Sequence, residues 1–262
     1  MTSISRRHFL TAGAVAAAVP ALAPSARAAR PAQGGAVPRD VGRKFKADGS
    51  VSRFGGNTFV GHVQQQGRDY DQFDGLLDIY REFPAHGFAS KIALTPPNSY
   101  HVTVFGGLND EDQGTPRWPR ALPPGMSVDA VTQQWLRGLQ ARPRLAEPRF
   151  EFAYGTAVTM SDGAPHVPLL PANDATARRL KAVRDALSEF TGIRDKNHDS
   201  YQYHLTVGYI HQLLTEPEAQ SLRTATDDWV ARLSARSATL VIPAFHFCSF
   251  RDMYAFRELH AL

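Results

Sequence analysis

Hydrophobic and polar residues alternate along two short stretches of this chain that share nearly the same sequence. Residues 100–104 read Tyr-His-Val-Thr-Val, and residues 203–207 read Tyr-His-Leu-Thr-Val. The β-branched and aromatic residues in both stretches predict β-strands. Because residues i and i+2 of a strand point to one face, each strand presents a histidine and a threonine together, about 7 Å apart. Tyr100 and Tyr203 turn to the opposite face, where packing in the core is favoured over stacking on a ligand.

The periodicity of apolar residues predicts further elements around both stretches. Helices are predicted at 69–83, 128–139, 173–190 and 216–233, and strands at 53–65, 88–94, 100–105, 149–160, 201–210, 239–250 and 253–259, the last two as a closing hairpin. Gly106-Gly107 is expected to end the first His-x-Thr strand, and Gly192 the third helix. The order strand, helix and His-x-Thr strand occurs twice, which favours an α+β fold whose two equivalent strands meet around a shared cleft.

Composition and charge are those of an ordinary globular protein. The chain has 262 residues, of which 43% are hydrophobic and 21% charged. Arg6, Arg7 and Arg27 are the formal charges of residues 1–28, so the net charge of +4 falls to 4 − 3 = +1 without them. This near-neutral remainder is unlike a non-specific nucleic-acid coat. The single cysteine, Cys248, excludes an intramolecular disulfide, and its apolar surroundings predict a buried, inert thiol.

The first 28 residues have the features of an export signal. Residues 5–10, Ser-Arg-Arg-His-Phe-Leu, resemble the twin-arginine motif, an alanine-rich run follows, and residues 26–28, Ala-Arg-Ala, fit a cleavage site before Ala29. The apolar run is too short for a spanning helix, although an uncleaved anchor is the alternative. We therefore expect recognition by the twin-arginine export machinery, a periplasmic or extracellular location and no stable membrane association after cleavage.

The remaining chain is predicted to hold a linker and one domain. Residues 29–50 are rich in proline, glycine and charge, which is typical of a linker that is poorly ordered at its start. Residues 51–262 contain no clean internal linker, and we expect one domain of two lobes. The polar loop 109–125 holds Arg117 and Trp118, which could cover a site. A surface loop pinned by Trp118 is the favoured alternative.

Two such histidine–threonine pairs facing one pocket would supply an acid, a base and two hydrogen-bond donors for an oxyanion. One His-x-Thr sequence is common, but its repetition in one chain indicates a functional pair. The other histidines show no spacing typical of a metal site, and His204 and His211 lack the helical arrangement of zinc proteases, so a zinc hydrolase is the least favoured alternative. The sequence contains no Gly-x-Ser-x-Gly elbow, Walker loop or dinucleotide fingerprint.

The two motifs, their spacing and the helix before the second copy resemble the 2H phosphoesterase superfamily, which includes 2′,5′ RNA ligase-like proteins and cyclic phosphodiesterases. The resemblance implies a bilobal α+β fold: two antiparallel sheets with pseudo-twofold symmetry, helices on the outside and a central cleft. It also implies a site that needs no metal or cofactor, with His101 and His204 catalytic and Thr103 and Thr206 binding the phosphate. The insertion after the first motif and the export signal depart from the RNA-processing members, which argues against a role in tRNA splicing.

We therefore expect a monomeric, metal-independent phosphodiesterase acting on 2′,3′-cyclic phosphates of nucleotides or short RNA. One histidine would deprotonate water while the other protonates the departing ribose oxygen on the opposite side of phosphorus, and each transfer contributes about 10² to 10⁴-fold. The symmetry of the sequence does not assign the two roles. The alternative is a non-catalytic protein that binds a phosphorylated nucleotide, and 2′,5′ ligation is the reverse reaction of the same class.

Overall fold

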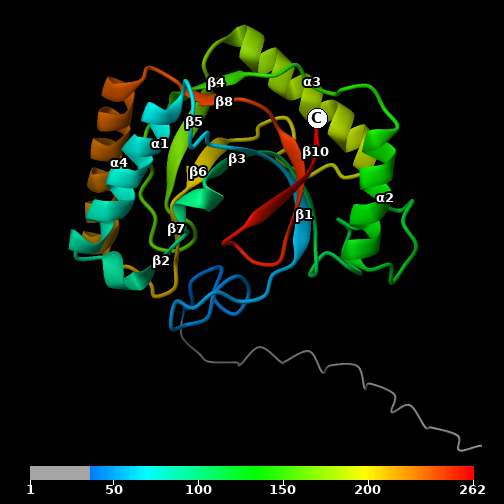
Figure 1. The fold of residues 1–262 in the computed structure, drawn as a ribbon. Coiled ribbons are helices and arrows are strands. Elements are labelled where there is room, and N and C mark those ends of the chain that lie inside the picture. Colours follow the sequence, from blue (N-terminus) through cyan, green and yellow to red (C-terminus); the bar gives the residue numbers. More distant parts are fainter. Residues whose placement is uncertain (1–35) are drawn as a thin grey trace, which may run out of the picture. The chain divides into compact units, whose positions relative to one another are not determined.

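The computed structural model describes residues 36–262, so the predicted signal peptide, its cleavage site and the start of the predicted linker lie outside the described residues. This part of the chain has the predicted α+β composition (Figure 1). Its helices are α1 (Tyr70–Glu82), α2 (Val128–Gln140), α3 (Asp174–Thr191) and α4 (Glu216–Arg236). Its strands are β1 (Gly56–His62), β2 (Ile92–Leu94), β3 (His101–Asn109), β4 (Phe150–Tyr154), β5 (His166–Pro171), β6 (Tyr203–Thr206), β7 (Gly208–Ile210), β8 (Leu240–Ile242), β9 (His246–Phe250) and β10 (Phe256–Ala261). None of these helices is long and apolar enough to cross a membrane.

The two motif strands form the centre of one continuous sheet. Eight antiparallel strands follow the order β10-β9-β1-β3-β6-β5-β4-β8, and β2 pairs separately with β7. The expectation of two equivalent sheets is therefore corrected: two groups of four strands are joined by β3 and β6, where Val102 pairs with Leu205. We call this junction the seam. The large sheet is curled, and the four helices lie outside it (Figure 1).

Glycine has a different effect in β3 from the one predicted. The strand continues through Gly106 and Gly107 to Asn109 instead of stopping there. A Cβ on Gly107 would lie 2.0 Å from Oδ1 of Asn57, and that oxygen accepts the N–H of Leu108. The glycine therefore permits a close approach of β1 and β3 rather than a turn. Gly192, by contrast, ends α3 with a φ of 74° as predicted.

Two further strand predictions need correction. The predicted strand 201–210 is divided at Val207 into β6 and β7, because β7 leaves the large sheet to pair with β2. Strand β5 is not predicted from the sequence, since prolines at its centre and end disfavour a strand. Pro168 is tolerated there because β4 pairs with β5 only from Leu169 onward.

The second half of the predicted linker is part of the folded unit. The carbonyl of Asp40 accepts the backbone N–H groups of Arg43, Lys44 and Phe45, which closes a compact turn. Phe45 is completely buried in a small second core that also contains Phe54, Tyr209 and Met253. One aromatic residue among many polar ones is a weak sequence signal, but its burial fixes this segment against the domain.

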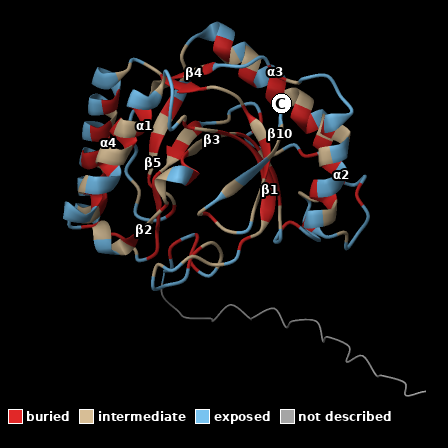
Figure 2. Ribbon diagram, viewed as in Figure 1, coloured by how far each residue is buried: buried red, intermediate tan, exposed pale blue. Residues whose placement is uncertain are grey.

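The outer face of the curled sheet carries the main core (Figure 2). Tyr100 and Tyr203 are buried on this face, as the alternation predicts. Cys248 is also buried, and the loss of solvation raises the pKa of its thiol. The histidines and threonines of both motifs lie on the opposite face and are only half-buried.

Candidate active site

The seam brings the two His-x-Thr motifs side by side in opposite directions. Because Val102 pairs with Leu205, each histidine lies across from the threonine of the other motif. Side chains directly opposite on neighbouring strands are about 5 Å apart at Cβ, and diagonal neighbours about 7 to 8 Å. The two histidines occupy the diagonal, which is a spacing that lets their rings approach a small tetrahedral anion from two sides.

A cavity of about 350 Å³, the seam cavity, lies over these strands. His101, Thr103, His204 and Thr206 all line it, so the structure brings together the four residues singled out from the sequence. Lys44, which the sequence does not single out, lines the same cavity. The cavity therefore combines two imidazoles, two hydroxyls and one ammonium group, a set suited to binding an anion.

Backbone carbonyl groups fix the tautomer of both motif histidines. Nδ1 of His101 lies 2.6 Å from the carbonyl oxygen of Ser99, and Nδ1 of His204 lies 3.1 Å from that of Gln202. A carbonyl oxygen only accepts hydrogen bonds, so each Nδ1 carries a proton and donates it. Nε2 is then the nitrogen of each ring that can exchange a proton with a ligand.

Burial lowers the pKa of His101 and of His204 to about 4, because both rings lose solvation that stabilises the imidazolium. The neighbouring His166 lowers the pKa of His204 further, and Lys44 adds to this effect. Both motif histidines are therefore neutral near pH 7 in the free protein. A bound phosphate would favour the protonation of one ring, because a nearby negative charge stabilises the imidazolium.

His101 lies in a closed, partly acidic surrounding. The ring of Phe256 covers it at a centroid distance of 4.3 Å, and the ring of His62 lies 6.1 Å away. Nδ1 of His62 is in turn 2.8 Å from Oε1 of Glu258. The ring of His62 therefore lies between the Glu258 carboxylate and His101.

His204 lies in a more basic surrounding. The ring of His166 is 4.9 Å from it, and Lys44 lines the same cavity. Nζ of Lys44 lies 3.4 Å from Oδ1 of Asp40 and 4.8 Å from the centre of the Tyr209 ring. These contacts hold the ammonium group at the cavity, and its burial lowers the pKa of Lys44.

Sequence reasoning gives no role to His62, His166 or Lys44. His62 pairs with His101 across β1 and β3, and His166 pairs with Thr206 across β5 and β6. Their positions follow from strand register, which a single sequence does not reveal. Lys44 lies in the segment predicted as a linker, so no local pattern marks it.

The loop after β3 is fixed rather than open. Trp118 packs against the main core. The guanidinium of Arg117 donates to Asp112, Asp195 and the carbonyl oxygen of Gly107. Arg117 lines the seam cavity, but its guanidinium N–H groups already donate to these protein oxygens. The structure agrees with the favoured alternative of a surface loop that is pinned to the fold.

One cluster in residues 36–262 has metal-ligand spacing, and it consists of Asp185, His198 and Asp199. None of these three residues lines the seam cavity. Lys181 lies 2.7 Å from Asp185 and 3.3 Å from Asp199, and Arg194 lies 2.8 Å from Asp199. The two cations already neutralise the carboxylates, which identifies the cluster as an ion-pair network on α3 and the following loop.

The chain is similar to one protein family, to one export signal and to several solved structures. Residues 44–162 match the family described as 2H-phosphodiest, a domain of unknown function (DUF1868), and residues 3–23 match the twin-arginine translocation signal. The crystal structure of a conserved protein of unknown function from Agrobacterium tumefaciens is 27% identical, with a TM-score of 0.75 over 87% of this chain and 94% of that chain.

Two other solved structures are more distant. A phosphoesterase is 12% identical with a TM-score of 0.44, covering 79% of this chain and 97% of that chain. Apo LigT from E. coli is 13% identical with a TM-score of 0.43, covering 80% and 98%. No curated protein matches the chain. The signal match indicates export through the twin-arginine machinery, and residues 44–162 of the chain are similar to the 2H-phosphodiest family.

Proposed function

We propose that this protein is a metal-independent phosphodiesterase that opens 2′,3′-cyclic phosphates of nucleotides or short RNA. The arrangement of both His-x-Thr motifs around one cavity supports this function most strongly. Each histidine has its Nδ1 tied to a carbonyl group and its Nε2 free, which is the state required for proton transfer.

The reaction is an in-line displacement at phosphorus. One neutral imidazole takes a proton from water as the water oxygen bonds to phosphorus. The bond from phosphorus to one ribose oxygen breaks, and the other ring, as an imidazolium, protonates that oxygen. Thr103, Thr206 and Lys44 stabilise the charge on the non-bridging oxygens. The product is a nucleoside monophosphate, and the two rings have exchanged protonation states.

The unequal surroundings of the two histidines support an assignment of the roles. Lys44 and His166 oppose a positive charge on His204, so this ring stays neutral and acts as the base. His62 likewise opposes a positive charge on His101, but the contact of His62 with Glu258 puts a carboxylate on this side of the site, where His204 has the ammonium group of Lys44 instead. His101 is therefore the acid that protonates the leaving oxygen.

A binding protein for a phosphorylated nucleotide is the second candidate, because the same cavity would hold such a ligand without turnover. The test is hydrolysis of the four 2′,3′-cyclic nucleotides in EDTA by the wild-type protein and by the His101→Ala and His204→Ala variants. The His260→Ala variant is the matched control, since this histidine of β10 lies outside the lining of the seam cavity.

We expect turnover in EDTA that falls by about 10²-fold or more in each motif variant and stays unchanged in the control. Activity that survives either motif substitution would place the reaction elsewhere. Binding without turnover of any nucleotide would favour the second candidate.

A further inference from the structure

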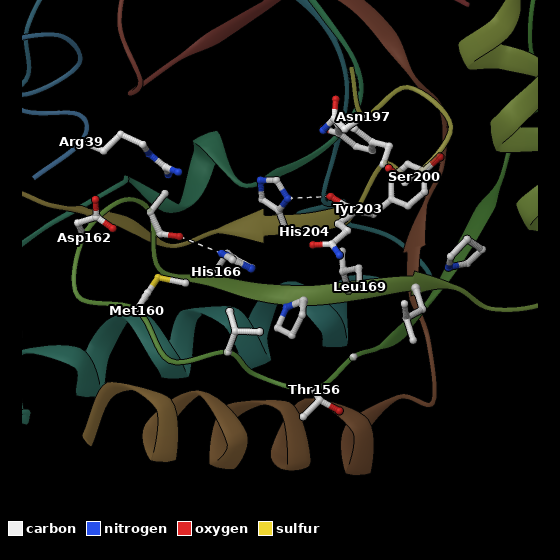
Figure 3. A pocket seen from close by; sticks show the side chains of 18 residues that line it. Arg39, Thr156, Met160, Asp162, His166, Leu169, Asn197, Ser200, Tyr203 and His204 are labelled. Carbon is white, nitrogen blue, oxygen red and sulfur yellow. Dashed lines mark hydrogen bonds between the residues drawn. The ribbon is translucent and has the colours of Figure 1, made fainter. Parts of the chain in front are cut away.

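A second cavity, of about 820 Å³, adjoins the seam cavity, and His204 lines both (Figure 3). We call it the β5 groove, because side chains of β5 form its floor. His166 and His204 lie between Arg39, Met160 and Asp162 on one side and Asn197, Ser200 and Tyr203 on the other (Figure 3).

The floor of the β5 groove is apolar and exposed. His166, Pro168 and Leu170 alternate along β5 and therefore share one face. Leu170 and Val158 are each 57% exposed, which makes them the most exposed large hydrophobic side chains in the described part of the chain. Apolar residues exposed together in a concave surface mark a binding site more often than singly exposed residues do.

Polar side chains border this floor. Asn197, Ser200 and Gln202, from the segment that leads into β6, lie along one edge. Amide and hydroxyl groups at the edge of an apolar floor fix the orientation of an organic ligand. The groove thus offers contacts to a molecule with one apolar face and polar edges.

The β5 groove opens beside His204, whereas an aromatic ring covers the corresponding place beside His101. The ring of Phe256 covers His101 and packs against the tilted ring of Phe250 at a centroid distance of 5.3 Å. A substrate whose phosphate occupies the seam cavity therefore has room to extend past His204, whereas Phe256 restricts the space beside His101.

On the basis of the proposed function, we propose that the β5 groove binds the organic part of the phosphodiester, and that substrates with a larger organic part are preferred. A volume of about 820 Å³ lies in the range of sites for organic ligands and exceeds what a phosphate requires. The apolar face of the substrate packs on Pro168 and Leu170, and its polar edge meets Asn197 and Gln202. A nucleoside and an aryl group both provide an apolar face, but only the nucleoside provides the polar edge.

Four probes that share a five-membered cyclic phosphate test this proposal. They are ethylene phosphate, the cyclic phosphate of 1-phenylethane-1,2-diol, cytidine 2′,3′-cyclic phosphate, and a dinucleotide ending in cytidine 2′,3′-cyclic phosphate. The measured quantity is kcat/KM of each probe relative to ethylene phosphate, for the wild-type protein and for the Leu170→Asp and Val158→Asp variants. Tyr80→Asp is the control, because this side chain is exposed on α1 and lines neither the β5 groove nor the seam cavity.

We expect the relative kcat/KM to rise at least about tenfold from ethylene phosphate to the larger probes, because they bury apolar surface in the groove. Leu170→Asp and Val158→Asp lower this ratio, and Tyr80→Asp does not. A higher ratio for the cytidine probes than for the phenyl probe identifies a nucleoside as the occupant. The reverse identifies an aryl group.

The proposal is overturned if all four probes react equally well, or if the groove variants leave the ratio unchanged, even when turnover itself is normal. If no probe reacts, the proposed function fails separately. Calorimetry with cytidine 3′-monophosphate then tests the groove alone, since Leu170→Asp is expected to weaken binding about tenfold and Tyr80→Asp is not.

Discussion

The two halves of the sheet carry the same motif and surround it differently. On both sides of the seam a histidine and a threonine share one strand face, and a carbonyl two residues earlier holds Nδ1 of the histidine. Beyond these shared features, Phe256 and the His62–Glu258 pair enclose His101. His204 faces Lys44, His166 and an open groove.

The shared residues and the differing surroundings have separate roles in our proposal: the first serve the reaction at phosphorus, and the second serve substrate recognition. In the proposed reaction the duplicated residues contact the phosphate from either side. The unduplicated segments differ between the halves: residues 38–54 supply Lys44 beside His204, and the β9–β10 hairpin supplies Phe256 and Glu258 beside His101. The motif accordingly predicts the class of reaction, whereas in our proposal the flanking segments determine the proton-transfer roles and the space for the substrate.

The largest expected effect tests the unequal roles of the histidines. His101→Ala should lower turnover of a cyclic nucleotide by about 10² to 10⁴-fold. It should lower hydrolysis of bis(4-nitrophenyl) phosphate by less than about tenfold, because nitrophenolate leaves without the help of an acid. His204→Ala should impair both reactions, as measured by nitrophenolate release. If His204→Ala is the variant spared on the aryl ester, the roles are reversed.

Substitution of the threonines tests whether both halves of the sheet contact the phosphate in the same way. Thr103→Val and Thr206→Val each remove one hydroxyl donor and keep the side-chain shape. Each should lower kcat by about 10²-fold, as the loss of one donor to a developing negative charge does. Steady-state kinetics on a cyclic nucleotide measures this. A large loss in one variant and none in the other would show that the phosphate contacts only one half of the sheet.

Lys44 tests the basic surrounding of His204. Lys44→Met keeps the length of the side chain and removes its charge, so we expect kcat/KM to fall about tenfold through the loss of one charged contact to phosphate. The remaining activity should also depend less on salt, because one charge no longer attracts the anion. Unchanged KM and salt dependence would remove Lys44 from the phosphate site.

The depressed pKa values of the motif histidines predict a smaller effect, on stability. In the unfolded chain these rings titrate near their ordinary pKa of 6.5, and in the folded protein at about 4. Between these pH values the unfolded state binds more protons than the folded state. The contribution of the two neutral rings to the free energy of unfolding is therefore fully present above pH 6.5 and is lost as the pH falls toward 4. The Tm of the wild-type protein should decrease over this range, and that of the His101→Gln/His204→Gln variant should decrease less. Equal slopes would contradict the depressed pKa values.

The sequence predicted the four helices and the main strands because their apolar periodicity and caps are local features. Asn173 and Gly192, for example, bound α3 as expected. It also predicted that His101 and His204 would share a cleft, since the repeated pentapeptide is a local signal. It did not predict β5, because Pro168 disfavours a strand wherever a neighbouring strand needs its missing N–H.

The surroundings of the site were beyond the reach of the sequence for a different reason. The positions of His62 and His166 depend on strand register, and that of Lys44 on the burial of Phe45 in a polar segment. Each is a long-range packing result that no local pattern encodes. The joining of the two groups of strands into one sheet likewise rests on the pairing of Val102 with Leu205.

The central claim is that both motifs act together on one phosphate, and a double-mutant cycle tests it most directly. The measurement is kcat for a 2′,3′-cyclic nucleotide in EDTA, for His101→Ala, His204→Ala and the double variant. Residues that act as a unit show strongly non-additive effects. We therefore predict that each single variant loses about 10² to 10⁴-fold, and that the double variant lies within about tenfold of the weaker single variant. A double variant that loses the full product of the two single effects, or a single variant that keeps wild-type activity, would contradict the account.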